Sequence, residues 1–515
     1  MAIFRYTASA DNTITNAFEA NLVTRGTGSN MGYADSLEVF SIYGQESGSS
    51  GQSQELSRFL IQFPIDAIAN DRTANRLPAS GSVAFYLKLY NAQHPFTLPQ
   101  DFTLTVAPVS QSWTEGAGLD MDEYQDLGYS NWMSASSTSA WTTVGGDYLT
   151  ASNYEVSFPE GYEDLEVDVS FLVEEWIRFK DTSIVPGVIK NYGFGIRLTG
   201  SEEAYFSASA GTNSGSVIQN TGGAKQSYYT KKFFARSTEY FFKRPVREAR
   251  WDDRVMDDRE SFYYSSSLAT AADNLYNLNF YNYVRGAQRN IPAVGTNKLL
   301  VSFYSSSGGE PTGSKLEISL GGGTATAGDV NTTASYVSAG IYSASVALTA
   351  ATKVDRLLAI HDVWHSGGVQ FFTGSFYPEL LPTYDNAPTF NRITSCKNLK
   401  KVYSQKDKTR FRFFVRSKDW SPTLYVVSTT NNPTEVIHSA SYSINRVIDN
   451  LDVVPYGTGS NFSTYLSYDK EGNYFDFDMS LLDTGYMYEI KLSYYNDSIG
   501  DWQEQSQTFK FRVEE

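Results

Sequence analysis

The sequence predicts an all-β protein with three β-sandwich domains, the first jelly-roll-like and the last immunoglobulin-like. Apolar and polar residues alternate with a period of two in many short segments, as in antiparallel sheets with one dry face. Aromatic residues make up 15% of the chain, and their flat rings pack well on a pleated surface. The chain has 515 residues, which is more than one core supports, so about three domains are expected.

The three domains are expected to span residues 1–250, 251–385 and 386–515. The first boundary falls in Lys243–Glu260, a mostly charged segment that should carry the last strand of the first domain before crossing into the second. The second boundary falls in Pro378–Asn391, where three prolines block ladder hydrogen bonds and indicate an extended linker.

The first domain should contain alternating strands and one short helix. Two strands place apolar residues on one face, namely Val83, Phe85, Leu87 and Leu89, and then Phe102, Leu104 and Val106. A third set of apolar residues recurs at the spacing of a helix: Val169, Leu172, Val173, Trp176 and Ile177. We therefore expect one short helix near residues 169–179, capped by Asp168 or Ser170 and lying across a sheet.

Strand patterns return in the last domain. The clearest sets are Phe411, Phe413 and Val415, then Tyr486, Tyr488, Ile490, Leu492 and Tyr494, and finally Phe509, Phe511 and Val513. The length of this domain and the number of strands expected in it are typical of an immunoglobulin-like domain. Cys396 is the only cysteine, so the disulfide of antibody domains is excluded, and we interpret this thiol as a packing residue.

The net charge of −16 disfavours nucleic acid and anionic membrane as partners. The chain starts without a basic stretch followed by an apolar run, and no segment approaches about 20 apolar residues. We therefore expect a protein that is made and used without crossing a membrane by the usual route. The 36 tyrosines favour contacts with copies of itself or other proteins, for which Lys243–Glu260 and the C-terminal strand ending at Val513 are candidates, with ordinary solvated surface as the alternative.

An acidic group follows Trp113 and includes Asp120, Asp122, Glu123 and Asp126. Calcium prefers closely spaced oxygen ligands, which makes Asp120, Asp122 and Asp126 candidate metal ligands. The spacing differs from that of an EF-hand loop. A solvated acidic loop is the alternative, and no other cofactor is expected.

Three tryptophans, Trp113, Trp132 and Trp141, lie in a stretch rich in serine and glycine. Exposed indole rings could stack on sugar rings and form a platform for glycan. Alternatively, Trp113 caps the edge of a core, and the other two rings are buried in loops or at a subunit contact.

The sequence favours a protein without enzymatic activity. Four histidines are present, and no nucleophile elbow, phosphate-binding loop, dinucleotide fingerprint or CxxC motif is found. His361 and His365 are four residues apart, a spacing that could bind zinc on a helix, but their neighbours indicate a strand and a bend. Structural histidines are the alternative interpretation.

Four ordered segments in the first half resemble the DNRLRE family of β-sandwich modules, which is related to some carbohydrate-binding modules. The segments are Asp11–Ile14 with Asn30–Tyr33 and Leu37–Val39, Arg58–Ile65 as the first buried strand, Val109–Gly116, and Val167–Trp176 with Asn191–Ile196; Phe234–Glu239 is similar to the closing strand. The resemblance implies a jelly-roll-like sandwich without enzymatic activity, and some relatives bind polysaccharide.

The remainder of the chain resembles virion structural proteins of marine bacteriophages. The segments are Gly340–Ser345 with Asp362–Trp364, Asp419–Thr423, Gly485–Ile490 and Phe509–Val513. The resemblance implies a tail, neck, baseplate or capsid component that is assembled in the host cytoplasm with copies of itself and other virion proteins. A capsid decoration protein and a polysaccharide-binding adhesin are the alternatives.

Overall fold

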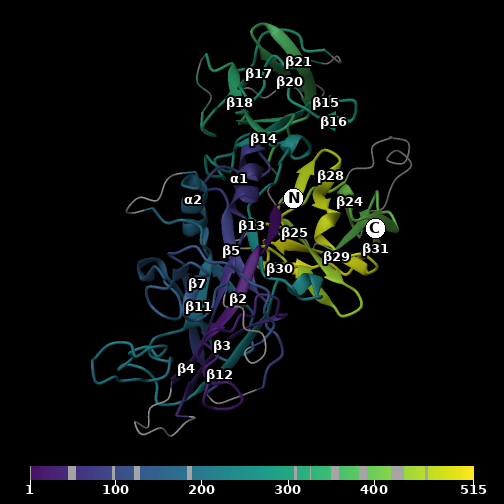
Figure 1. Ribbon diagram of the computed structural model, residues 1–515. Helices are drawn as coiled ribbons and strands as arrows, with labels where there is room; N and C mark the ends of the chain where they lie inside the picture. Colours follow the sequence, from purple (N-terminus) through teal and green to yellow (C-terminus); the bar gives the residue numbers. More distant parts are fainter. Residues whose placement is uncertain are drawn as a thin grey trace. The chain divides into compact units, whose positions relative to one another are not determined.

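The computed structural model confirms the all-β class, with two α-helices in the part of the chain that it describes (Figure 1). The chain divides into two compact units, Ala2–Trp251 and Asp252–Glu515. The predicted boundary near residue 385 lies outside the described residues. The described residues are 2–44, 54–95, 99–120, 128–181, 188–306, 310–324, 326, 328–349, 359–381, 391–418, 434–458 and 462–515.

Two sheets form the sandwich of the first unit. The four-stranded sheet has the order β1 (Ile3–Thr7), β13 (Val246–Arg250), β5 (Ala84–Leu89) and β10 (Leu165–Asp168). The seven-stranded sheet has the order β12 (Tyr228–Phe234), β3 (Ser36–Tyr43), β4 (Gln54–Gln62), β11 (Phe194–Leu198), β6 (Phe102–Pro108) and β9 (Tyr154–Phe158), and β2 (Ala10–Thr15) also pairs with β4. A small hairpin joins β7 (Ser134–Ser136) to β8 (Ser139–Ala140).

The main core lies between these sheets, and a second core covers the outer face of the larger one. Strand β4 serves both, because Phe59 and Ile61 point into the main core while Leu56 and Leu60 point into the second. Eight of the nine residues of β4 are buried, as expected for a strand covered on both faces.

The predicted helix is confirmed as α2 (Ser170–Arg178), which buries Leu172, Val173 and Trp176. The carboxylate of Asp168 accepts hydrogen bonds from the backbone N–H and the hydroxyl of Ser170, at 2.9 and 2.6 Å. Asp168 therefore bonds to the first residue of the helix, although it lies one position before the cap residue, Val169.

A second helix, α1 (Ile65–Thr73), corrects the prediction of a single helix and of one strand over Arg58–Ile65. Strand β4 ends at Gln62. Pro64 has no N–H for the ladder, and its fixed φ suits the start of a helix. Arg72 then binds Glu174 of α2 through two hydrogen bonds of 2.5 and 2.6 Å.

The segment Lys243–Glu260 carries the last strand of the first unit, β13, as the sequence predicts, and its role in contacts with partners stays a prediction. Every residue of β13 is buried, because β1 and β5 pair with it on both sides. The charges on one face are paired, since Glu248 bonds to Arg5 at 2.7 Å and to Arg250 at 2.6 Å.

The second unit begins with a six-stranded sheet whose two end strands approach each other. Phe280 of its first strand stacks on Phe372 of its last strand, with ring centres 5.1 Å apart, so the sheet curls around a core that contains Trp364 and Tyr342. The strand order is β14 (Tyr276–Tyr281), β19 (Ile341–Val346), β18 (Asn331–Ser338), β17 (Leu299–Ser306), β20 (Ala359–Ser366) and β21 (Val369–Phe376), with a hairpin of β15 (Tyr283–Val284) and β16 (Ala287–Gln288).

The C-terminal part is an immunoglobulin-like sandwich of two sheets. One has the order β22 (Arg392–Cys396), β24 (Lys408–Ser417), β28 (Gly472–Asp478) and β27 (Ser467–Asp469). The other has the order β23 (Val402–Ser404), β31 (Phe509–Glu514), β29 (Met487–Asn496), β25 (Ala440–Arg446) and β26 (Leu451–Val454), with β30 (Asp501–Glu504) on β29.

The last strand, β31, pairs with β29 over Phe509–Arg512 and with β23 over Arg512–Glu514. Its alternation holds as predicted, because Phe509, Phe511 and Val513 are buried. Phe411 and Phe511 meet across the sandwich with ring centres 5.6 Å apart. The role of this strand in contacts with partners stays a prediction.

Candidate functional site

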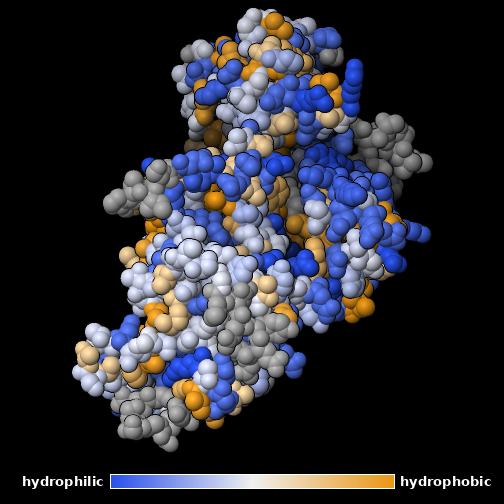
Figure 2. Space-filling view, in the orientation of Figure 1, coloured by the Kyte–Doolittle hydropathy of each residue, from blue (hydrophilic) through white to orange (hydrophobic). Residues whose placement is uncertain are grey.

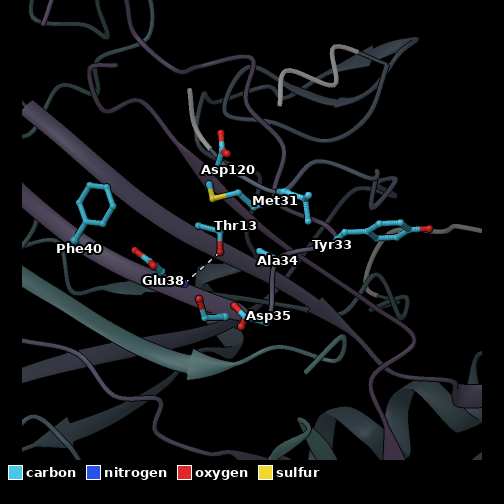
Figure 3. A pocket seen from close by; sticks show the side chains of 10 residues that line it. Thr13, Met31, Tyr33, Ala34, Asp35, Glu38, Phe40 and Asp120 are labelled. Carbon is cyan, nitrogen blue, oxygen red and sulfur yellow. Dashed lines mark hydrogen bonds between the residues drawn. The ribbon is translucent and has the colours of Figure 1, made fainter. Parts of the chain in front are cut away.

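A surface groove of about 730 Å³ crosses the outer face of the larger sheet in the first unit. Figure 3 shows Phe40 and Tyr33 at opposite ends, with Thr13 and Met31 between them. The full lining comprises Thr13, Met31, Tyr33, Ala34, Asp35, Ser36, Glu38, Phe40, Leu119 and Asp120.

The alternation of β3 explains the floor of the groove. Leu37 and Val39 point into the main core and are buried, so Ser36, Glu38 and Phe40 point outward. The backbone N–H of Glu38 donates to the Thr13 hydroxyl of β2 at 3.2 Å, which ties the two strands together beneath the groove.

A close approach between two loops fixes the wall. The side-chain oxygen of Asn30 accepts hydrogen bonds from the backbone N–H of Gly118 at 2.9 Å and of Gly32 at 3.1 Å. A Cβ at Gly118 would lie 1.8 Å from the backbone oxygen of Asn30, so only glycine fits. Tyr33 and Leu119 are thereby held at the rim, where they are 56% and 45% exposed.

Carboxylates alternate with apolar groups around the groove. Glu38 forms an ion pair of 2.5 Å with Lys232, whereas Asp35 and Asp120 are exposed residues of the wall. Carboxylate oxygens accept hydrogen bonds from hydroxyl groups, and the ring of Tyr33 offers a flat apolar face. The groove can therefore hold a flat, hydroxylated ligand.

A partly buried polar network supports the wall. Arg236 makes two 2.6 Å bonds to Glu115, whose carboxylate also accepts from the backbone N–H of Asp11 at 2.8 Å. Asp11 accepts in turn from the backbone N–H of Arg236 at 2.7 Å. Burial raises the pKa of Asp11 to about 7. These charges hold the segment around residue 115 in place.

The three tryptophans do not form the glycan platform that was considered for them. Trp113, Trp132 and Trp141 are 8%, 0% and 5% exposed and belong to the second core. Each indole N–H donates to a backbone oxygen at 2.8 Å. The hydrophobic effect favours the burial of these large rings, so they stabilise the long loops over the sheet instead of presenting a face to sugar.

The calcium candidates are only partly described. Asp120 lies in the wall of the groove, while Asp122 and Asp126 lie outside the described residues. Among the residues that the structure does describe, no group of three or more histidine, cysteine, aspartate or glutamate side chains is arranged to hold a metal ion.

The two histidines of β20 do not share a metal ion. On a strand, four residues span about 13 Å, which is too far for two ligands of one ion. His361 is buried, and the ring of His365 contacts the Ser302 hydroxyl at 2.7 Å.

The sequence did not point to the groove. Tyr33 and Phe40 are aromatic residues in a loop and on an alternating strand, and many other segments of this chain look the same. The groove exists because residues 13–40 meet residues 119–120, and only the fold brings these segments together.

Comparisons with known proteins give no family. No helix within the described ranges is long and apolar enough to cross a membrane. No family model and no curated protein matches the sequence. Three solved structures share 9–12% identity with the chain, at TM-scores of 0.14 to 0.16.

They are the Yersinia pseudotuberculosis adhesin InvE, trypsin-activated alpha-2-macroglobulin from Escherichia coli, and the FN1–FN3 domains of chicken CNTN1. These matches cover 47%, 93% and 58% of this chain, respectively. The chain spans 59% of the adhesin, 29% of the macroglobulin and 83% of the CNTN1 fragment. At such TM-scores, these similarities assign no function.

Proposed function

We propose that this chain is a non-enzymatic structural protein of a bacteriophage particle, located in the tail, neck or baseplate. It assembles through contacts with copies of itself and with other virion proteins, and its assembly takes place in the host cytoplasm. The sequence resemblance to virion proteins motivates this proposal.

The observation that carries the proposal is a set of buried ion pairs that join segments far apart in the sequence. Arg58 of β4 and Glu203 are each 6% exposed and form two hydrogen bonds of 2.8 and 2.7 Å, although they are 145 residues apart. On the other sheet, Glu248 joins Arg5 to Arg250. Pairs of this kind favour one arrangement of strands, which suits a rigid part that must repeat identically in an assembly.

Exposed apolar side chains are available to form protein–protein interfaces. Figure 2 shows apolar residues in small groups over the visible face. Large side chains that are more than half exposed include Val23, Phe171, Tyr240, Leu268 and Ile448. Aromatic and aliphatic residues of this kind form the centres of protein interfaces.

Immunolabelling of purified particles tests the proposal. Antibodies raised against the recombinant chain should bind at one fixed position on the tail, neck or baseplate of phage particles, as seen by negative-stain electron microscopy. Antibodies pre-adsorbed with the recombinant chain are the control. Particles that carry no label, and whose proteins do not include this chain by mass spectrometry, would refute a virion role.

A polysaccharide-binding adhesin is the second candidate, and the groove is the observation that favours it. A glycan array should then show binding that is lost in Tyr33→Ala, because this ring lies at the rim of the groove. Tyr240→Ala is the matched control, since both tyrosines are 56% exposed and Tyr240 is not among the groove residues. Equal binding by the two variants would exclude the groove as the glycan site.

A further inference from the structure

The segment that follows the first unit adds to the free edge of β27 as a short parallel strand. Met256 bridges to Tyr468. The backbone N–H of Tyr468 donates to the oxygen of Val255 at 3.0 Å, and that of Asp257 donates to the oxygen of Tyr468 at 3.1 Å. The N–H of Val255 bonds to the Ser467 hydroxyl at 3.0 Å.

Side chains hold the same segment at both ends. The guanidinium of Arg254 lies over the ring of Tyr465, 4.4 Å from its centre. Asp258 accepts from the Tyr468 hydroxyl at 2.8 Å and from the backbone N–H of Asn277 at 2.6 Å. Asp258 thus connects the immunoglobulin-like domain, through Tyr468, with β14 of the six-stranded sheet that begins the second unit.

A charge imbalance lies within this attachment. Asp257 and Asp362 are 3% and 0% exposed, and both bind the single guanidinium of Arg259. The Arg259–Asp362 distance is 2.6 Å. Two buried carboxylates that share one cation leave an uncompensated negative charge when both are ionised, which is unfavourable away from water.

The other groups around Asp257 do not supply the missing positive charge. Asp469 of β27 is already paired with Arg412 at 2.6 and 2.9 Å. Tyr281 of β14 lies near and is neutral at physiological pH, because burial raises its pKa.

Asp258 has a different set of neighbours. Besides the Tyr468 hydroxyl, His438 lies 4.0 Å away, and Tyr276 is also near. Burial raises the pKa of Asp258, while a protonated His438 would oppose that rise.

We propose that residues 254–258 form a proton-controlled latch, which a proton on Asp257 keeps docked along β27 and which loosens when that proton is lost. Burial raises the pKa of Asp257 to about 7. The undocked segment, exposed to water, has a normal aspartate pKa of about 3.9. Docking is therefore strongest in acid, weakens by up to about tenfold per pH unit between these two values, and is weakest and constant above about pH 7.

Hydrogen exchange of the full chain measures the latch directly. After correction for intrinsic rates, peptides covering residues 252–258 and 465–469 should be at least about tenfold more protected at pH 5 than at pH 8. The Asp257→Asn variant mimics the protonated side chain, so its protection should stay high at both values. Asp497→Asn removes an exposed carboxylate outside the latch and should retain the pH dependence of the wild type.

A second variant tests the proposal independently if Asp257→Asn does not fold. Asp362→Asn leaves Arg259 to neutralise Asp257 alone, so the segment should stay docked at pH 8 and the pH dependence should disappear. Equal protection of the wild type at pH 5 and pH 8 would overturn the proposal. So would an unchanged pH dependence in both Asp257→Asn and Asp362→Asn.

Discussion

Arg247 and Arg250 lie three residues apart on the buried strand β13, but their guanidinium groups have opposite surroundings. Arg250 bonds to Glu248 and Glu166 at 2.6 and 2.8 Å. Arg247 points into the main core, where none of its side-chain nitrogen atoms has a hydrogen-bond partner. It packs against three rings, with centres at 4.8, 5.1 and 5.8 Å, those of Phe63, Trp176 and Phe194. Burial lowers its pKa to about 9, so it stays charged at neutral pH.

This contrast predicts opposite effects of the same substitution. Arg247→Met replaces an unpaired buried cation by an apolar side chain of similar length, and should raise the melting temperature of the first unit by about 2 to 4 °C, or about 1 kcal/mol. Arg250→Met leaves Glu248 with one partner fewer and should lower stability by about 3 kcal/mol. Differential scanning calorimetry compares the two. A loss of stability in Arg247→Met as large as that in Arg250→Met would show that Arg247 has a binding partner.

At the scale of elements, periodic segments were predictable, whereas the helix after Pro64 and the pairing of buried charges were not. The helix near 169–179 and the strand ending at Val513 were found because apolar spacing follows burial of one face. Helix α1 was missed because it begins directly after a buried strand, at Pro64. The strand within Lys243–Glu260 was expected, but the burial of its charges was not, because Arg250 and Glu248 pair with Glu166 and Arg5, 84 and 243 positions away, and sequence alone does not show such pairs.

The candidate site was harder to predict than the fold for the same reason. The serine-rich surroundings of Trp132 left both an exposed and a buried ring open, and the ring is fully buried because the loops fold over the outer face of β4. The groove depends on Asn30 accepting from Gly118 across 88 residues. Local patterns determine which face of a strand is dry, while grooves depend on contacts between distant loops.

At the scale of the whole molecule, the first and last strands of the first unit pair with each other. Strand β1 pairs with β13, so Ile3 lies opposite Arg250 in the same sheet. The backbone N–H of Trp251 donates to the oxygen of Ala2 at 3.0 Å, and the rings of Phe4 and Trp251 meet with centres 5.2 Å apart. A unit whose first and last strands are neighbours contains every partner that its four-stranded sheet needs.

Residues 2–251 should therefore fold without the rest of the chain. We expect this fragment to be monomeric, to give a dispersed amide NMR spectrum and to melt in one cooperative transition. A fragment of residues 2–244 lacks β13, which leaves β1 without its neighbour and one edge of β5 unpaired, so it should not fold. If 2–251 were unfolded, the first sandwich would need the second unit for its stability. If 2–244 folded equally well, the pairing of β1 with β13 would contribute little to it.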